Sequence, residues 1–541
     1  MDTGSEFPPT LPTLFSRALT GRPDRTALIT SRETLSYEAL NRRSNAIAHA
    51  LVDAGIEPGD RVATALSNRL EAPVVDVAIY KAGGARLPIN SSLSTTEITY
   101  MLTDSGADTM FCEPSLVSDI DGSTDELPLT LRCVVDTDDP ADGWQTLADL
   151  EHRGESGAPP TVSAEPASIA GHFYTGGTTG EPKGVLYSQS CLSANFVAHL
   201  TELGFSETDT GLVSTPLSHS GGTFLQSGLL AGGTVCIQRG FEVEQLVETV
   251  TTHDVTWTFL VPTMLYRLLD AGVTGDDVPS LEHVLYGAAP MQSDRLRDAL
   301  ARFGSIFVQF YGQTEVPNLI TTLDRRDHAR AVDDRDGNGG GDGNDDGDGD
   351  ARLLRSAGRP CSFVDVRIVD PTTDEEQPAG ERGEITVSSP YSFERYHDRP
   401  DETAKVLRDG WVHTGDIGRF DEDGYLYLLD RLHNVIVTGG MNVYSSDVET
   451  VLGNHPAVAD VAVIGVPHEE WGEAVHALVV THEDEHIDES NLLEFADDRF
   501  AGYKKPKSVE IVDDLPTTPL GKLDKQSIRD YYWGDRDRRI G

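Results

Sequence analysis

Cysteine, lysine and long apolar runs are all scarce in this sequence of 541 residues. The five cysteines are far apart and form no Cys-x-x-Cys pair, which argues against a disulfide framework and against a zinc site. The first residues carry acids and prolines rather than a basic segment followed by an apolar one, so we expect no signal peptide. The longest stretch without acids or bases, 210–238, is interrupted by Pro216 and several glycines and makes a poor membrane span. We therefore expect a cytoplasmic protein with no membrane span.

The charge of the chain is strongly unbalanced. Aspartate and glutamate number 89 against 43 lysines and arginines, which gives 43 − 89 = −46 at pH 7. A surface this acidic repels nucleic acid and anionic lipid, so neither is an expected partner. The basic residues are mostly arginine, because lysine occurs only at 81, 183, 405, 504, 505, 507, 522 and 525. Such a surface is tolerated where concentrated salt shortens the Debye length, and we interpret it as salt adaptation, in other words a halophilic protein.

The spacing of apolar residues alternates between helical and strand periods through the first two thirds of the chain. Helical patterns cover 36–51, 72–81, 193–203, 243–253 and 293–303, and strand patterns cover 61–66, 85–89, 234–238, 257–261, 281–286 and 306–311. Alternation of this kind is typical of parallel sheets covered by helices. We therefore predict an α/β fold whose large N-terminal domain, 1–430, consists of layered α/β subdomains.

The pattern changes after Asp430. Strand patterns at 458–466, 474–480 and 508–512 and a helical pattern at 491–500 predict a smaller α+β domain over 431–541. Within the N-terminal domain, 333–350 is almost wholly Asp, Gly and Asn, and we predict a disordered low-complexity insertion there. A calcium-binding loop is the alternative, although the segment lacks the terminal Glu and the flanking helices of an EF-hand.

One glycine-rich segment, 174–184, has the composition of a phosphate-binding loop. Its glycines let backbone N–H groups approach an anion, its threonines add hydroxyl donors, and its lysine adds a positive charge. It is not a Walker motif, because a proline precedes the lysine and no Gly-Lys-Ser/Thr closes the loop, which counts against a P-loop NTPase. The residues in question are Thr175, Gly176, Gly177, Thr178, Thr179, Gly180 and Lys183.

This segment resembles the signature T-S-G-T-T-G-x-P-K-G of the adenylate-forming superfamily, which comprises acyl- and aryl-CoA synthetases, peptide-synthetase adenylation domains and luciferases. Gly176 stands where the family usually has Ser, which removes one hydroxyl donor but keeps backbone freedom. Further segments resemble the family's other motifs in the same order, from about residue 10 to about residue 530. Taken alone, Glu315 or Asp416 would be interpreted as a solvated acid, and the order of the segments carries the resemblance.

The resemblance implies a role for each matching segment. It places Gly287, Ala288, Ala289 and Pro290 along the adenine. In the segment Tyr311-Gly312-Gln313-Thr314-Glu315, it stacks the tyrosine on adenine, brings Thr314 to the α-phosphate and makes Glu315 a Mg²⁺ ligand. It gives Asp416 of His413-Thr414-Gly415-Asp416 the ribose hydroxyls, and Arg431 a ribose or phosphate contact. It makes Lys522 the cation that bridges the carboxylate of the substrate and the α-phosphate.

The family's reaction has two steps. ATP converts a carboxylic acid, fatty or aryl, into an acyl-adenylate with release of pyrophosphate, and CoA then takes the acyl group and releases AMP. The resemblance implies that the C-terminal domain is mobile and swings about a hinge between the steps. It places Gly439 and Gly440 in the CoA tunnel and His433 at the hinge, where an imidazole would make the swing pH-dependent. An exposed hinge residue without a role is the alternative for His433.

The segment 216–222 resembles the region beside the acyl pocket, with His219 near the carboxylate and Gly221 and Gly222 leaving room for the acyl group. Amino-acid-activating relatives usually carry an Asp in this region, and none occurs between Gly211 and Gln238. We therefore expect an AMP-forming acyl-CoA synthetase, an acid–thiol ligase. The alternatives are an adenylation enzyme that loads a carrier protein and a non-catalytic member of the fold. The sequence leaves open the identity of the acid and the choice between a monomer and a homodimer.

Overall fold

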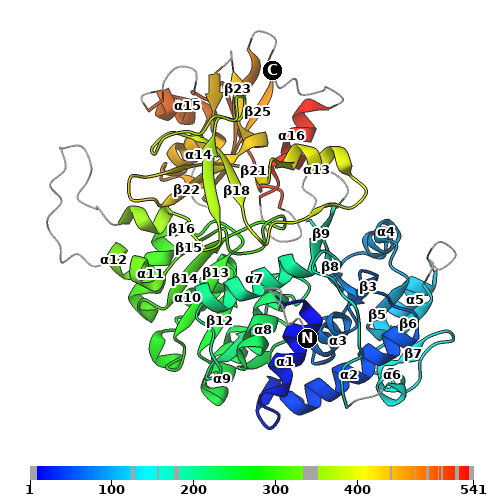
Figure 1. Ribbon diagram of the computed structural model, residues 1–541. Coiled ribbons are helices and arrows are strands. Elements are labelled where there is room, and N and C mark those ends of the chain that lie inside the picture. Colours follow the sequence, from blue (N-terminus) through cyan, green and yellow to red (C-terminus); the bar gives the residue numbers. More distant parts are fainter. Residues whose placement is uncertain are drawn as a thin grey trace. The chain divides into compact units, whose positions relative to one another are not determined.

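A computed structural model describes residues 9–122, 127, 129–154, 157–175, 182–332, 351–438, 441–468, 471–482, 487–497, 499–500, 504–517 and 523–534. The chain divides into two compact units. The first unit comprises 1–175, 182–366 and 387–412, and the second comprises 176–181, 367–386 and 413–541. The predicted insertion at 333–350 lies outside the described residues. Figure 1 labels the helices and strands named below.

The first unit contains a nine-stranded sheet whose centre is parallel. The strands from β14 to β1 run parallel to their neighbours, whereas β15, β16 and β2 add antiparallel edges. The order is β16 (Arg359–Pro360), β15 (Thr321–Leu323), β14 (Phe307–Tyr311), β13 (His283–Gly287), β12 (Trp257–Leu260), β10 (Thr210–Val213), β11 (Thr234–Ile237), β1 (Thr26–Ile29) and β2 (Thr34–Ser36).

An eight-stranded sheet forms the other half of the first unit. Its parallel part runs from β8 to β7, and β9 and β19 extend it in the antiparallel sense. The order is β19 (Arg395–Tyr396), β9 (Gly184–Ser188), β8 (Ile169–Tyr174), β4 (Ala85–Pro88), β3 (Arg61–Ala65), β5 (Thr109–Cys112), β6 (Leu131–Val134) and β7 (Gln145–Thr146). β8 and β9 are antiparallel neighbours, and the glycine-rich segment connects them in the sequence.

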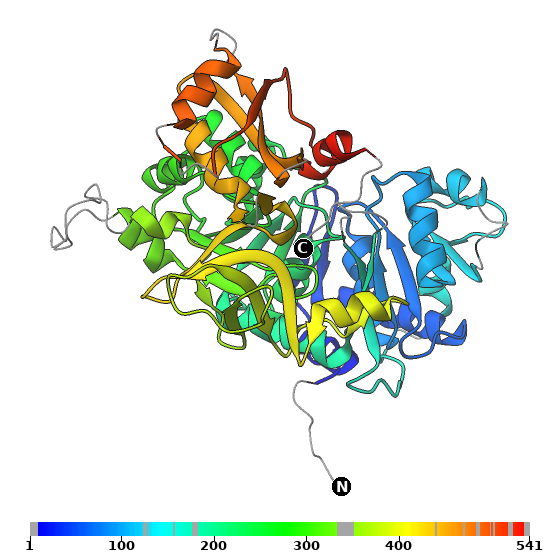
Figure 2. The same cartoon turned by 90° about the horizontal axis from the view of Figure 1, so that it is seen from above.

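Helices separate the two sheets of the first unit (Figures 1 and 2). α8 (Ser220–Ala231) packs on β10 and β11, α7 (Gln189–Glu202) packs on β8 and β9, and the two helices contact each other. α1 (Leu11–Thr20) and α3 (Glu71–Lys81) complete this buried layer. The remaining helices of this unit are α2 (Tyr37–Asp53), α4 (Thr95–Ser105), α5 (Pro114–Gly122), α6 (Leu147–Arg153), α9 (Val243–His253), α10 (Pro262–Asp270), α11 (Ser293–Phe303), α12 (Arg325–Val332) and α13 (Pro400–Val406). The predicted layered α/β architecture is confirmed.

The second unit holds most of one sheet and all of another. In the first of these, β17 (Asp365–Val369), β18 (Gly383–Ser388), β21 (Trp411–Phe420) and β20 (Leu407–Arg408) are neighbours in that order, and β22 (Leu426–Arg431) pairs with β21. The other sheet has the order β24 (Met441–Val443), β23 (Ile436–Thr438), β26 (Gly472–Thr481) and β25 (Val458–His468), with β27 (Ser508–Ile511) beside β26. Its helices are α14 (Ser445–Gly453), α15 (Glu489–Asp497) and α16 (Lys525–Trp533). The predicted α+β character of the C-terminal part is confirmed, whereas a boundary at residue 430 stays a prediction.

Most predicted elements differ from the structure by one or two residues at an end, and the helix expected over 193–203 covers Gln189–Glu202. For two of the elements the difference has one physical reason. The helix expected over 491–500 covers Glu489–Asp497, and the strand expected over 281–286 covers His283–Gly287. Phe500 packs against the core of the C-terminal sheet, and Leu281 is buried, although both lie outside these elements. A buried apolar side chain in a turn continues the periodic pattern, so the spacing predicts an element that is too long or starts too early.

Lys81 is fully buried, and its ammonium joins α3 to α2. It donates to the side-chain oxygens of Asn41 at 2.7 Å, Ser44 at 2.9 Å and Asn45 at 2.7 Å, which are all neutral acceptors. Burial lowers the pKa of Lys81 to about 7. Because an unfolded lysine titrates near about 10.4, the unfolded chain binds more protons than the folded chain between these values, and the contribution of Lys81 to stability rises with pH there.

We predict that the difference in unfolding free energy between the wild type and Lys81→Met shifts in favour of the wild type by about 1.5 kcal/mol from pH 7 to pH 8.5. Urea unfolding of both proteins in concentrated KCl measures this difference. Titrations of other groups change the unfolding free energy of both proteins equally, so they cancel in the difference. A difference that does not change with pH would mean that Lys81 keeps its proton throughout this range.

Among the helices in the described part of the chain, none has both the length and the apolar character that a membrane crossing requires.

Candidate active site

Two of the predicted nucleotide-binding segments lie at the ends of neighbouring parallel strands. β13 ends at Gly287 and β14 ends at Tyr311, and the register pairs Gly287 with Phe310. A Cβ atom at Gly287 would lie 2.5 Å from the carbonyl oxygen of Phe310, so only glycine fits there. Ala288 follows with a φ of +65°, which turns the chain off the sheet, and Ala289 and Pro290 come next. The carboxyl ends of adjacent parallel strands are the usual ligand position in open α/β sheets, and both segments lie there.

The loop after β14 is held closely against itself. A Cβ atom at Gly312 would lie 2.5 Å from the backbone nitrogen of Asn318, and the backbone N–H of Gln313 donates to the carbonyl of Val316 at 3.1 Å. The hydroxyl of Tyr187, on β9, donates to the carbonyl oxygen of Thr314. The backbone oxygen of Glu315 accepts from the N–H of Phe393 at 2.8 Å. All of these contacts are made by backbone atoms of the loop, so they fix its backbone at the carboxyl end of β14.

Hydrogen bonds join Thr175 and Lys183, which lie near the two ends of the glycine-rich segment. The backbone N–H of Thr175 donates to the carbonyl of Lys183 at 3.0 Å, and the N–H of Lys183 donates to the Thr175 hydroxyl at 3.2 Å. Gly176, Gly177, Thr178, Thr179 and Gly180 lie outside the described residues. The two described residues of the predicted phosphate loop, Thr175 and Lys183, are therefore brought together.

Lys183 and Glu315 are connected through one tyrosine. The hydroxyl of Tyr396 donates to Oε1 of Glu315 at 2.5 Å, and Nζ of Lys183 lies 5.4 Å from the centre of the Tyr396 ring. Burial and the nearby Glu315 carboxylate raise the pKa of Tyr396, so its hydroxyl stays a donor. Lys183 also forms an ion pair with Glu402 on α13. The structure thus brings the predicted phosphate cation and the predicted metal carboxylate into one cluster.

The predicted acyl-site residues lie at the start of α8. His219 is the N-cap residue, and Gly221 and Gly222 occupy the first turn, where a Cβ atom would lie 2.5 Å from Thr215 Oγ1 and 2.1 Å from the Leu217 carbonyl, respectively. Ser220 connects this turn to the loop after β14, because its hydroxyl donates to Oδ1 of Asn318 at 2.9 Å. The structure therefore places the start of α8 next to the predicted nucleotide segment.

Asp416 of the second unit is held from both sides. Thr414 Oγ1 accepts from the N–H of Asp416 at 3.1 Å, and Oδ1 of Asp416 lies 3.2 Å from Nε of Arg431, its cross-strand partner on β22. The buried carboxylate of Glu384 accepts from Nδ1 of His413 at 2.9 Å and from the N–H of Gly415 at 3.0 Å. Glu384 therefore fixes the backbone that carries Asp416. The predicted ribose contact Asp416 and the predicted ribose or phosphate contact Arg431 are neighbours.

The remaining predicted site residues belong to the C-terminal part of the chain. Gly439, Gly440 and Lys522 lie outside the described residues, as does the side chain of His433, whose backbone belongs to the 3₁₀ turn Leu432–Asn434. Next to this turn, Oδ2 of Asp430 accepts from the Ser445 hydroxyl at 2.8 Å and from the Ser446 N–H at 3.2 Å.

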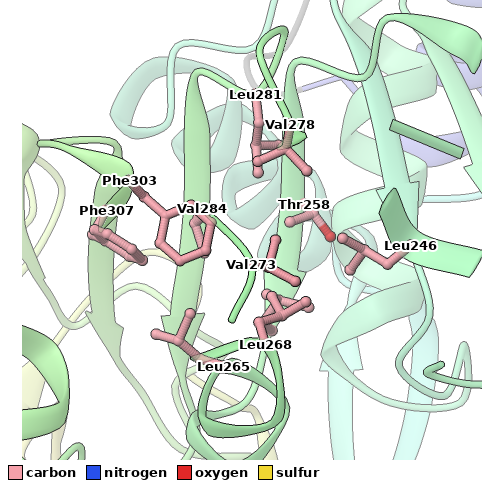
Figure 3. A pocket seen from close by; sticks show the side chains of 11 residues that line it. Leu246, Thr258, Leu265, Leu268, Val273, Val278, Leu281, Val284, Phe303 and Phe307 are labelled. Carbon is pink, nitrogen blue, oxygen red and sulfur yellow. The ribbon is translucent and has the colours of Figure 1, made fainter. Parts of the chain in front are cut away.

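A small cavity in the first unit is unsuited to a nucleotide or a carboxylic acid (Figure 3). It is enclosed by aliphatic and aromatic side chains, and its one hydroxyl, that of Thr258, already donates to the Leu212 carbonyl at 2.9 Å. Val284 is the second residue of β13 and Phe307 is the first of β14, so both lie away from the carboxyl ends of these strands. It is a packing cavity lined by Leu246, Thr258, Leu260, Leu265, Leu268, Val273, Val278, Leu281, Val284, Phe303 and Phe307.

Residues 15–397 match the model of the AMP-binding enzyme family, and residues 447–522 match the model of the AMP-binding enzyme C-terminal domain. This chain belongs to the AMP-binding enzyme family. The predicted membership of the adenylate-forming superfamily is thereby confirmed.

Two relatives within the AMP-binding enzyme family cover most of the chain. The medium/long-chain-fatty-acid–CoA ligase FadD8 of Mycobacterium tuberculosis is 35% identical over 497 residues, which are 88% of this chain and 81% of that protein. Feruloyl-CoA synthase of Amycolatopsis sp is 36% identical over 511 residues, 94% of this chain and 96% of that protein. Among solved structures, ATP-bound MatB from Rhodopseudomonas palustris has a TM-score of 0.83 at 30% identity, covering 96% of this chain and 99% of that chain.

Three side chains that the sequence does not single out hold residues of this family's motifs in place. Tyr396, Glu402 and Glu384 contact Glu315, Lys183 and His413, respectively, from far along the chain. Two of them are acids among 89 in the sequence, so composition does not single them out. Of the three, Glu384 could have been recognised from the sequence, because an acid within a buried strand needs a hydrogen-bond or ionic partner.

Replacing Glu384 by glutamine tests its support of Asp416. We predict about a tenfold loss in kcat/KM for ATP, since hydrogen bonds to a charged group are worth about 1.5–3 kcal/mol and the amide cannot accept from both donors as the carboxylate does. The ATP dependence of pyrophosphate exchange measures it. Glu381→Gln, which changes an exposed acid nearby, is the control and should behave as wild type. An unchanged kcat/KM in Glu384→Gln would remove Glu384 from the support of the site.

Proposed function

We propose that this protein is an AMP-forming acyl-CoA synthetase. It joins a carboxylic acid to the AMP part of ATP with release of pyrophosphate, and it then transfers the acyl group to CoA with release of AMP. The observation that carries the proposal is the placement of Gly287 and Tyr311 at adjacent parallel strand ends, in a chain that belongs to the AMP-binding enzyme family. The fatty-acid and feruloyl ligases among its relatives bear out the predicted enzyme class, an acid–thiol ligase.

Each proposed contact suits the chemistry of the nucleotide. The aromatic ring of Tyr311 offers a surface on which adenine stacks, with Gly287, Ala288, Ala289 and Pro290 beside it. The side-chain oxygens of Asp416 accept hydrogen bonds, as a ribose diol requires, and Arg431 lies beside it. Thr175, Lys183 and Thr314, together with the glycines and threonines at 176–180, bind the phosphates.

Mg²⁺ fits the residues at the loop after β14. Glu315 presents a carboxylate oriented by Tyr396, and Mg²⁺ in nucleotide sites is usually held by one or two carboxylates together with substrate phosphates. No group of three or more His, Cys, Asp or Glu side chains suited to a metal occurs in the residues that the structure covers, so a cage formed by the protein alone is not proposed. Bound there, Mg²⁺ would supply positive charge against the pyrophosphate leaving group.

The first step requires two anions to meet, the carboxylate of the substrate and the α-phosphate. We assign this to Lys522, whose ammonium neutralises both while the carboxylate oxygen attacks phosphorus and pyrophosphate departs. The attacking group is already ionised, so no general base is needed. For the second step we assign Gly439 and Gly440 to the pantetheine passage and His433 to the hinge of a mobile C-terminal domain. His219, Gly221 and Gly222 adjoin the acyl group.

Acid-dependent exchange of pyrophosphate into ATP tests the first step across a panel of fatty, aryl and amino acids. We expect exchange with a fatty or aryl acid and none with amino acids, and thioester formation when CoA is added. Release of ADP and phosphate instead of AMP and pyrophosphate would contradict the proposal, and so would the absence of exchange with every acid.

A carrier protein is the second candidate acceptor, because one relative is named as a fatty acid–[acyl-carrier-protein] ligase. This is ScoC of Streptomyces coeruleorubidus, 33% identical over 524 residues, 96% of this chain and 95% of that protein. Thioester formation with CoA in the absence of any carrier protein separates the two candidates. Thioester formation with a phosphopantetheinyl carrier protein but not with CoA would favour the carrier protein as the acceptor.

The setting in which the enzyme works is also part of the proposal. We place it in the cytoplasm of a salt-rich cell, as a monomer or homodimer. The five cysteines are all free and buried, which suits a reducing compartment, and the net charge of −46 suits concentrated salt.

A further inference from the structure

The base of the glycine-rich loop belongs to a closed ring of contacts within the first unit. The hydroxyl of Tyr100, on α4, donates to the carbonyl of Pro182 at 3.1 Å, and Nη2 of Arg399 donates to the Tyr100 oxygen at 3.2 Å. Nη1 of Arg399 lies 3.4 Å from Oε1 of Glu402, and Oε2 of Glu402 pairs with Nζ of Lys183. Lys183 follows Pro182 directly in the sequence, so the peptide bond between them closes the ring.

Glu402 is the one anion in this ring, and it bridges two cations with its two oxygens. The hydrogen bond from Lys183 is the main cause that lowers the pKa of Glu402, so the carboxylate is ionised at neutral pH. The side chains of Lys183 and Glu402 keep 35% and 31% of their exposure, so the ion pair is reachable from solvent. An ion pair of this exposure is weak, and a phosphate with more negative charge competes with it.

We propose that Glu402 is a displaceable counter-ion for Lys183, which it holds in place until a nucleotide phosphate takes over the ammonium. This inference rests on the proposed function, because it assumes that Lys183 contacts a phosphate of ATP. When Lys183 changes partner, Glu402 remains paired with Arg399, so its charge is not left without compensation. Glu402 is a positioning residue: it sets the location of Lys183 in the free protein, and its release accompanies binding of the triphosphate.

The sign of the expected effect follows from this exchange. Binding of ATP to the wild type has to break the Lys183–Glu402 pair, whereas an amide at position 402 offers a weaker contact to break. We therefore expect Glu402→Gln to bind ATP about threefold more tightly than wild type, within the range for a partly exposed ion pair. Adenosine lacks phosphates and should bind both proteins equally.

A matched control separates the local exchange from the general loss of one negative charge. Asp401 is the preceding residue on α13 and is exposed, so Asp401→Asn makes the same change of charge without touching the ion pair. Titration calorimetry with ATP and with adenosine in concentrated KCl gives the dissociation constants for the three proteins. Thermal unfolding of each checks that both variants fold.

The outcomes are distinct. A gain in ATP affinity confined to Glu402→Gln supports the proposal, as does separation of Lys183 Nζ from the Glu402 carboxylate in ATP-bound crystals. Equal affinity in all three proteins, an equal gain in both variants, or a loss in Glu402→Gln overturns it, and so does an intact pair in the ATP complex. If the wild type binds no ATP and Lys183→Met changes nothing, the proposed function itself has failed. If Lys183→Met weakens ATP binding while Glu402→Gln matches Asp401→Asn, only the inference has failed.

Discussion

Lys522→Ala is expected to lower the rate of adenylate formation by on the order of 100- to 1,000-fold, because removal of one preorganised group that stabilises developing negative charge has effects of this size. The substitution removes the cation that we place between two anions, and water screens that repulsion poorly inside a closed site. Thioester formation from supplied acyl-adenylate should change by less than about threefold, since that step starts after the phosphorus–oxygen bond has formed.

Pyrophosphate exchange measures the first half-reaction, and CoA consumption with synthetic acyl-adenylate measures the second. Lys405→Ala removes an exposed lysine of α13 and is the control for loss of a positive charge from a lysine-poor chain. Equal loss of both half-reactions in Lys522→Ala would mean that the lysine supports the fold or both steps. Full exchange activity would place the bridging cation elsewhere.

Transfer from 3 M to 0.1 M KCl is expected to lower the temperature of unfolding by on the order of 10 °C. The net charge of −46 is spread over one chain, and the Debye length increases from about 2 Å to about 10 Å on this dilution. Acids that concentrated salt isolates from one another then repel across the surface, and the unfolded chain relieves this repulsion by separating them. Calorimetric scans at several KCl concentrations measure the effect.

A variant distinguishes charge repulsion from a general effect of salt on apolar burial. Asp276, Glu381 and Asp401 are exposed, and conversion of all three to their amides should raise the unfolding temperature at 0.1 M KCl but not at 3 M. Equal behaviour of the variant and the wild type at both concentrations would show that salt acts through burial instead. An unfolding temperature independent of KCl would contradict salt adaptation altogether.

The elements whose pattern reflects packing on one face were predicted well. The helices at 243–253 and 293–303 have the bounds that the spacing indicates, and β13 and β14 place Gly287 and Tyr311 at neighbouring strand ends. Errors occurred where burial continues past an element, as at Phe500 and Leu281. Periodicity reports which side chains are buried, and it reports backbone conformation only through that burial.

Pairings across long separations could not be predicted in the same way. Lys183 and Glu402, or Tyr396 and Glu315, meet only because β19 joins the antiparallel edge of the eight-stranded sheet next to β9. That edge consists of the two residues Arg395–Tyr396, too few to give a periodic signal. The chain has 89 acids, and the topology determines which acid pairs with a given lysine. The local sequence around that acid does not identify it.

The burial of every cysteine has a practical consequence for testing the proposed hinge. Cys112, Cys133, Cys191, Cys236 and Cys361 are at most 3% exposed, and burial raises the pKa of Cys112 to about 12. Thiolates are the reactive form, so the native protein should resist maleimide reagents. Tyr531 is 82% exposed on α16, and Tyr531→Cys would then give a single labelling position. A fluorophore attached there would follow the C-terminal domain through each turnover without removal of any native thiol.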